Sequence, residues 1–227
     1  MAEAQANLGA VKSALGKPVE ALACLRAALA LNPLIESARS NLASVLIGLG
    51  AYAEAIEHCQ LALRENAQCV DAHYLWGDAW LRLGRPQEAI PRYQTALQLR
   101  PDFAEAHSNL ATAYYQLNRT TEAAVHYRAA LRIKPDLADA QNNLASVLLR
   151  LGDLPAAIVH YREALKLNPD FVDAYANLAM ALIQAGQIPD AVAANDAALR
   201  LNPEHPNART NRDYLRQEVA KIRGQVP

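Results

Sequence analysis

Cysteine is scarce in this sequence. The three cysteines, Cys24, Cys59 and Cys69, are an odd number and lack any CxxC spacing, so neither a disulfide framework nor a zinc site is predicted. Aromatic residues are few as well, and β-branched residues form no alternating runs. That composition argues against β-strands, and the dominance of alanine and leucine favours helices.

The sequence also lacks an excess of charge of either sign. Its 22 lysines and arginines nearly balance 23 aspartates and glutamates, so no overall positive field would gather nucleic-acid phosphates. No window approaches the run of about 18 apolar residues that a membrane span needs. The first residues have neither the basic start nor the apolar core of a secretory signal. We therefore expect a cytoplasmic protein that binds neither nucleic acid nor membrane.

Catalytic motifs are missing too. The sequence has no Gly-rich phosphate loop, no GxSxG and no HExxH, each of which would place reactive groups at a known spacing. We therefore expect no enzyme activity, no catalytic residues and no cofactor.

What the sequence does have is repetition at a period of 34 residues. Prolines recur in phase, with one interruption at Ala67, as Pro33, Pro101, Pro135, Pro169 and Pro203. With these prolines at the thirty-second position, the repeats are 2–35, 36–69, 70–103, 104–137, 138–171 and 172–205. Such a period is typical of one supersecondary unit stacked on itself.

Other repeat positions hold fixed residue types. The seventh is leucine or tryptophan, the eighth is glycine or alanine, and the twentieth and twenty-seventh are always alanine. Small residues at fixed points let two helix backbones approach to about 8 Å. We expect one helix over about the first fourteen residues of each repeat and a second from the eighteenth to the thirty-first. The turn between them needs a left-handed residue, such as Gly152 or Asn118.

On these residues the sequence resembles the tetratricopeptide repeat family, whose pattern places the same residue types at the same spacings. The resemblance covers all six repeats and implies an all-α, right-handed α-α superhelix forming a single domain over residues 1–227. Residues 206–224 begin in phase like a seventh repeat but hold Arg212 and Asp213 where Leu and Ala are expected. They predict a capping helix, since exposed ends of a solenoid need a polar face.

Two local features predict details of the helices: aspartates near three helix starts, and a proline inside one helix. Aspartates precede acidic residues by three positions at three helix starts, in the pairs Asp102 with Glu105, Asp136 with Asp139, and Asp170 with Asp173. That spacing is typical of a capping box. Pro91 lies one turn inside the second helix of the third repeat, where it is predicted to kink the helix.

Histidines share the twenty-third position in three repeats, as His58, His126 and His160. Equivalent positions of stacked repeats lie on the order of 10 Å apart, whereas zinc needs each nitrogen within roughly 2.1 Å. No metal site is predicted from them.

Asparagine recurs at the sixth position, interrupted only by Leu75, as Asn7, Asn41, Asn109, Asn143, Asn177 and Asn211. In a helix interior asparagine is less favourable than alanine by up to about 0.7 kcal/mol. Helix stability alone therefore does not explain the recurrence. Two interpretations stay open: the amides bond across neighbouring first helices, or they face an open groove and hold a ligand.

The ligand interpretation has a geometric basis. A primary amide complements the N–H and C=O groups of an extended peptide. Successive repeats lie on the order of 10 Å apart, and an extended peptide rises about 3.3 Å per residue. Successive asparagines would therefore hold every third peptide bond of a bound peptide. Further groove candidates come from the ninth and twelfth positions: Ser44, Thr112, Ser146 and Tyr115.

These asparagines resemble those of the superhelical tetratricopeptide region of O-GlcNAc transferases, which hold an extended protein substrate in the inner groove. The resemblance implies that role for Asn41, Asn109, Asn143 and Asn177, and for the terminal Asn7 and Asn211. Our leading hypothesis is a non-catalytic module that binds an extended segment of another protein. The alternatives are the substrate-recruiting region of a larger glycosyltransferase and a self-associating scaffold that forms a homo-oligomer.

Overall fold

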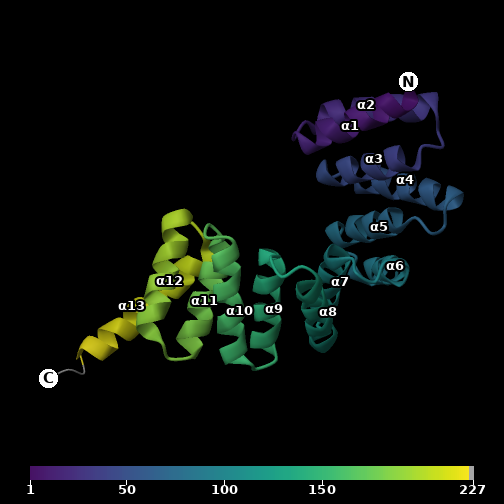
Figure 1. Ribbon diagram of the computed structural model, residues 1–227. Coiled ribbons are helices and arrows are strands. Elements are labelled where there is room, and N and C mark those ends of the chain that lie inside the picture. The colour runs from purple at the N-terminus through teal and green to yellow at the C-terminus, as the bar shows by residue number, and fades with distance from the viewer. Residues whose placement is uncertain (225–227) are drawn as a thin grey trace. The chain divides into compact units, whose positions relative to one another are not determined.

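The computed structural model describes residues 1–224, which fold into helices joined by short turns (Figure 1). The helices are α1 (Ala2–Ala14), α2 (Pro18–Leu31), α3 (Glu36–Gly48), α4 (Tyr52–Glu65), α5 (Val70–Arg82), α6 (Pro86–Leu99), α7 (Ala104–Gln116), α8 (Thr120–Ile133), α9 (Ala138–Arg150), α10 (Leu154–Leu167), α11 (Val172–Gln184), α12 (Ile188–Leu201) and α13 (Pro206–Gly224). The described residues form no strand. The all-α repeat fold expected from the sequence is confirmed.

The helices belong to two compact units. The first covers Met1–Leu117 and holds α1 to α7, and the second covers Asn118–Pro227 and holds α8 to α13. Within each unit, helices that follow one another in the chain pack in pairs, such as α1 with α2 and α9 with α10. The first helices of neighbouring pairs are also in contact: α3 contacts α5, and α11 contacts α13. The single domain proposed for residues 1–227 stays a prediction.

The repeat positions expected to pack closely are buried. None of the alanines at the twentieth and twenty-seventh positions is more than 1% exposed. In the third repeat, a Cβ added to Gly77 would lie 2.8 Å from the ring of Tyr93, so the eighth position faces the twenty-fourth. At the seventh position Leu42, Leu110, Leu144 and Leu178 are buried, whereas Leu8 at the start of the first unit is 43% exposed. The core therefore follows the repeat pattern.

The turns between paired helices take the expected left-handed conformation. Gly152 has φ 86°, and Asn118 adopts φ 60° where other repeats have glycine. The second helix of each repeat begins at the seventeenth position and ends at the thirtieth, one residue earlier than expected. Helix α6 runs through Pro91 without interruption from Pro86 to Leu99.

The capping boxes predicted at three helix starts are wrong. The N-cap residues are Phe103, Leu137 and Phe171, and none of these helices has a side-chain cap hydrogen bond. Each aspartate lies one residue before the N-cap, so it is displaced from the position at which a side chain caps the first turn. A different aspartate does cap a helix: Asp153 Oδ1 accepts a hydrogen bond from Ala156 N at 3.2 Å.

The last helix, α13, occupies Pro206–Gly224, the range predicted for the capping helix. It packs on α12 and α11 of the second unit. Ala208, Asn211 and Leu215 form its buried face. Among the described residues, no helix combines the length and apolar character needed to cross a membrane.

Candidate functional site

In the first unit the sixth-position asparagines differ in their contacts. Asn109 Nδ2 donates a hydrogen bond to the hydroxyl of Tyr74, at 3.1 Å, which joins α7 to α5. Asn41 is half-buried and Asn7 is exposed. Neither of these two side chains makes a hydrogen bond within the described residues. The first unit therefore contains one asparagine that links two first helices and two whose amides are unused.

The hydroxyl that Asn109 contacts belongs to an aromatic cluster. The ring centroid of Tyr74 lies 4.7 Å from that of Phe103 and 6.0 Å from that of Tyr93. Burial raises the pKa of Tyr74 to about 12, so the phenol stays protonated. The hydroxyl of Tyr93 is buried without a hydrogen-bond partner. This cluster holds the amide of Asn109 in place.

Asp78 brings a carboxylate to the same part of the first unit. Burial raises the pKa of its side chain, and Arg82 opposes that rise. The Nε atom of Arg82 lies 3.7 Å from Asp78 Oδ1. The hydroxyls of Tyr74 on α5 and Tyr93 on α6, the amide of Asn109 on α7 and the partly paired carboxylate of Asp78 on α5 therefore lie in one part of the first unit.

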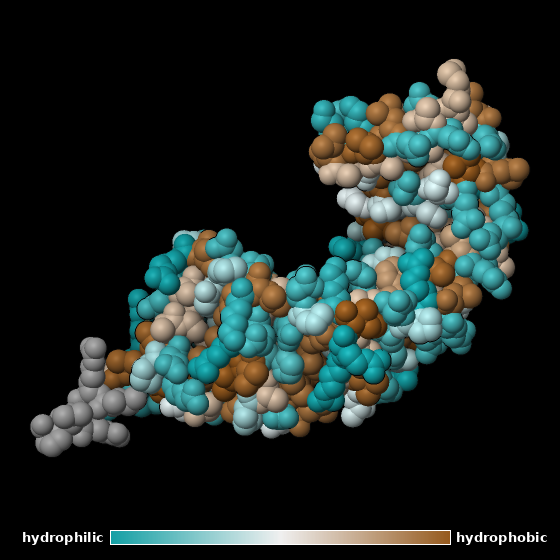
Figure 2. All heavy atoms as spheres, in the orientation of Figure 1, coloured by the Kyte–Doolittle hydropathy of each residue, from teal (hydrophilic) through white to brown (hydrophobic). Residues whose placement is uncertain are grey.

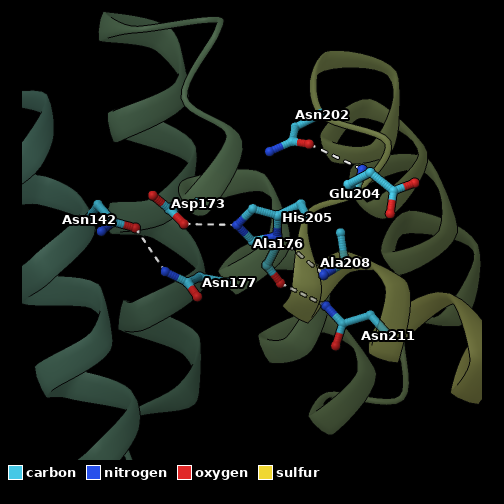
Figure 3. A network of polar contacts seen from close by, with 9 residues as sticks. All are labelled: Asn142, Asp173, Ala176, Asn177, Asn202, Glu204, His205, Ala208 and Asn211. Carbon is cyan, nitrogen blue, oxygen red and sulfur yellow. Dashed lines mark hydrogen bonds and ion pairs between the residues drawn. The ribbon is translucent and has the colours of Figure 1, made fainter.

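In the second unit a side chain that the repeat pattern did not single out joins two asparagines of the sixth position. Asn142, at the fifth position, is only 6% exposed. Its Nδ2 donates to Asn143 Oδ1 at 3.2 Å. Its Oδ1 accepts from Asn177 Nδ2 at 3.2 Å, a bond drawn in Figure 3. The amide of Asn142 thereby connects α9 to α11.

Asn211 differs from the other asparagines predicted to contact a ligand, because its side chain is fully buried. Its side chain is 1% exposed, and its Nδ2 donates to the backbone carbonyl of Ala176 at 2.9 Å (Figure 3). An amide in that environment packs α13 onto α11 and has no exposed surface to offer a ligand. For Asn109, Asn177 and Asn211 alike, the sixth position bonds to the fifth position of the preceding repeat.

The other predicted groove residues are partly engaged within the fold. Ser146 Oγ donates to the carbonyl of Asn142 at 3.1 Å and lies 2.9 Å from the hydroxyl of Tyr161. Thr112 Oγ1 donates to the carbonyl of Ser108 at 3.1 Å. Ser44 is exposed, and Tyr115 is half-buried.

A histidine that sequence reasoning missed fixes the start of α13. His205 Nε2 donates to Asp173 Oδ1 at 2.9 Å, and its Nδ1 accepts from the backbone N–H of Ala208 at 3.3 Å (Figure 3). Just before it, Asn202 Oδ1 accepts from Glu204 N at 3.1 Å. The repeat offered no signal for His205, because the corresponding residue elsewhere is Phe, Leu, Ile or Cys.

The described residues contain no group of three or more His, Cys, Asp or Glu side chains that could hold a metal ion. Burial lowers the pKa of His58 and of His160, which favours their neutral forms. His160 Nδ1 instead lies 2.7 Å from Gln141 Oε1, a contact between α10 and α9.

The three cysteines are free thiols with different exposure: Cys59 and Cys69 are buried, and Cys24 is half-buried. Burial raises the pKa of Cys59 to about 12 and also raises that of Cys69.

Because the thiolate is the reactive form, we expect a thiol-specific dye at about pH 8 to modify Cys24 alone in the folded protein. All three thiols should react in denaturing urea. Spectrophotometric counting of modified thiols checks this, with Cys24→Ser as the control that removes the early reaction; a fast reaction that persists in Cys24→Ser would contradict it.

On the face that Figure 2 shows, hydrophilic and apolar residues are intermixed over both units. Neither kind dominates that face.

Comparisons with known proteins place this geometry in context. A family model for the tetratricopeptide repeat matches residues 6–69, 74–138 and 142–206. A search of the curated proteins gave no match.

Several solved structures have a similar fold. A chain from the crystal structure of the APC/C hetero-tetramer Cut9–Hcn1 aligns over 95% of this chain with a TM-score of 0.86 and 17% identity; this chain spans 42% of its length. PilF of Pseudomonas aeruginosa aligns over 94% of this chain and 97% of its own, with a TM-score of 0.84 and 19% identity. YrrB, described as having an unusual peptide-binding site, aligns over 83% of this chain and 97% of its own, with a TM-score of 0.68 and 18% identity. At these identities the likeness shows the fold alone.

Proposed function

Because the chain belongs to the tetratricopeptide repeat family, we propose that it is a non-catalytic module that binds an extended segment of another protein. A role in protein–protein interaction is the general expectation for this family. The similar fold of YrrB, a protein described as having a peptide-binding site, supports the narrower statement that the ligand is a peptide.

The observation that carries the proposal is the unused hydrogen-bonding capacity of the sixth-position amides. Asn109 and Asn177 each use only Nδ2, in bonds to the preceding first helix, which leaves Oδ1 as an acceptor. Both side chains are half-buried, so part of each still meets solvent. Asn41 has its whole amide available. A peptide backbone, with one donor and one acceptor per residue, matches groups of this kind.

The bonds between first helices are compatible with this role and add to it. An amide whose N–H is held by Asn142 or Tyr74 cannot rotate freely, so its oxygen has a fixed direction. A pre-oriented acceptor loses less entropy when a ligand binds. The structural and the ligand interpretations of the asparagines are therefore parts of one arrangement.

Neighbouring side chains complete the proposed contact surface in each unit. Ser44 lies three positions after Asn41, which places both on the same side of α3. Ser146 has the same relation to Asn143 on α9, and Thr112 to Asn109 on α7. With Asn7 and Tyr115, these residues remain candidates. The resemblance to the asparagines of O-GlcNAc transferases adds that the segment is recognised through its backbone.

The first test examines backbone recognition. Linear peptides that bind the 227-residue chain would be selected from a random library, and one binder would be resynthesised with a single N-methyl group at each position in turn. N-methylation removes one backbone donor and retains the side chain. We expect affinity, measured by isothermal titration calorimetry, to fall by about fivefold to tenfold at positions about three residues apart. Equal losses at every position, or losses only on side-chain truncation, would contradict the proposal.

Two asparagine variants separate binding from folding. Asn41→Ala removes an amide without a hydrogen bond, so we expect weaker peptide binding and a thermal midpoint that is unchanged or slightly higher. Asn177→Ala also leaves the buried Oδ1 of Asn142 without its donor and should lower the midpoint as well. If Asn41→Ala binds the selected peptides as tightly as the unmodified chain does, Asn41 is not part of the contact surface.

A further inference from the structure

The third repeat departs from its neighbours on the side of the first helix that carries the proposed contact surface. Its sixth position is Leu75 instead of asparagine, and its ninth position is Asp78, where Ser44 and Thr112 stand in the repeats on either side. Leu75 and Asp78 are three positions apart on α5, so they lie on the same side of that helix. Helix α5 contacts both α3 and α7. Between two asparagine-bearing helices, α5 therefore offers an aliphatic group and an acid.

The carboxylate of Asp78 is only partly paired within the fold. Its side chain is 15% exposed, and its one ion pair within residues 1–224 is with Arg82, whose Nε lies 3.7 Å from Oδ1. That distance is too long for a hydrogen bond, and the side chain of Arg82 is 64% exposed. A carboxylate that is largely removed from water needs hydrogen-bond donors or a cation. Arg82 meets this need only in part.

The nearby phenols do not supply the missing donor. Burial, and then the negative charge of Asp78, raise the pKa of Tyr74 and that of Tyr93, so the acid lies close to both. Within residues 1–224, however, neither hydroxyl forms a hydrogen bond with Asp78. The carboxylate therefore keeps the capacity to bind a donor from outside the chain.

The charge balance of the first unit favours a cation as that donor. The second, fifth, sixth, ninth and thirteenth positions share one side of a first helix. In α1, α3, α5 and α7 the charged residues at these positions are Glu3, Asp71, Asp78, Glu105 and Arg82. Arg100, which follows α6, lies 3.5 Å from Asp71 and offsets part of the acidic charge. Acids still outnumber bases, which favours a segment that carries positive charge.

We propose that Asp78 binds a lysine or arginine side chain of the extended segment, with the aliphatic part of that side chain against Leu75. Both residue types join a cationic head to an apolar stem, which matches an acid beside a leucine. The inference rests on the proposed function and adds to it a requirement on the sequence of the ligand.

The spacing of the repeats also places the basic residue within the segment. Asn41 on α3 and Asn109 on α7 belong to the repeats on either side of α5. Repeats lie on the order of 10 Å apart, and an extended chain rises about 3.3 Å per residue. The basic residue should therefore lie about three residues from the backbone group that each asparagine holds.

Selection from a random library of linear peptides tests this inference. The selection would be run in parallel on the 227-residue chain, on Asp78→Asn and on Glu57→Gln. Asp78→Asn keeps the shape of the side chain and removes its charge. Glu57→Gln is the matched control, because it removes one negative charge from an exposed position of α4 in the same unit. We expect a lysine or arginine at one fixed position of the peptides selected on the unmodified chain and on Glu57→Gln, and loss of that preference on Asp78→Asn.

One selected peptide then measures the effect by isothermal titration calorimetry. Replacing its basic residue by norleucine should weaken binding to the unmodified chain by about tenfold, and binding to Asp78→Asn by less than about twofold. Arg82→Gln removes the cation that competes for Asp78, so it should tighten binding of the basic peptide by about twofold to threefold. Opposite changes in the two variants distinguish a direct contact from a general loss of structure.

The outcomes separate this inference from the proposed function. A basic preference that persists on Asp78→Asn, or selected peptides without a basic residue, would overturn the inference and leave the extended-segment proposal standing. Failure to select any linear peptide would overturn both. Circular dichroism checks the fold of each variant. If Asp78→Asn does not fold, Asp78→Ser takes its place, since serine is the ninth-position residue of the second and fifth repeats.

Discussion

Replacing Leu144 by alanine is expected to lower the free energy of unfolding by about 2 to 5 kcal/mol. Leu144 occupies the seventh position of the fifth repeat, on α9, and is 1% exposed. Truncation removes buried methyl groups and leaves a cavity that the packed helices of the second unit fill only in part. Urea denaturation followed by circular dichroism would measure the loss.

Leu151→Ala is the matched control for that experiment. Leu151 lies in the same repeat, directly after α9, and is 45% exposed. The chemical change is the same, but little apolar surface leaves a packed environment, so we expect a loss of less than about 1 kcal/mol. Similar losses for the two variants would show that the seventh position does not carry the core in the way the structure indicates.

The burial of Leu144 could be predicted from the sequence because its position recurs in each repeat. Leucine recurs at the seventh position in five of the six repeats, which indicates that the packing geometry there is the same. The alanines at the twentieth and twenty-seventh positions fix the distance between paired helices. The helices, the turn residues Gly152 and Asn118, and the last helix follow from the same periodicity. Helix ends were predicted less well, since the second helices begin one residue early.

The polar contacts could not be foreseen in the same way, because they depend on positions where the repeats differ. The partner of a sixth-position asparagine is the hydroxyl of Tyr74, the amide of Asn142 or the carbonyl of Ala176. All three lie at the fifth position, whose identity changes from repeat to repeat. The repeat pattern identifies only positions whose residue type recurs. It therefore singled out the asparagines but not the variable fifth-position groups that accept their hydrogen bonds.

The capping boxes illustrate a related difficulty. The spacing of Asp102 and Glu105 fits a capping box in sequence, but Phe103 stands at the N-cap and its ring packs 4.7 Å from that of Tyr74. The residue at the N-cap of α7 thus makes an aromatic contact with α5 instead of a side-chain cap. A local sequence signature such as the capping box contains no information about tertiary packing of this kind.

The second large effect is expected at Asn195. Its side chain is 1% exposed, and both Nδ2 and Oδ1 are buried without a hydrogen-bond partner. An unsatisfied buried polar group costs about 1 to 3 kcal/mol, and an apolar side chain of the same shape removes that cost. We therefore expect Asn195→Leu to raise the free energy of unfolding by about 1 to 3 kcal/mol, measured by urea denaturation.

Asn211→Leu separates this explanation from a general benefit of leucine. Asn211 is equally buried in the same unit, but its Nδ2 donates to the carbonyl of Ala176 while its Oδ1 lacks a partner. The change loses one hydrogen bond and relieves one unsatisfied atom, so the two effects nearly cancel and stability should shift by less than about 1 kcal/mol. If both variants gain equally, the gain comes from added apolar burial. A gain confined to Asn195→Leu would mean that the unsatisfied amide of Asn195 destabilises the packing of α12.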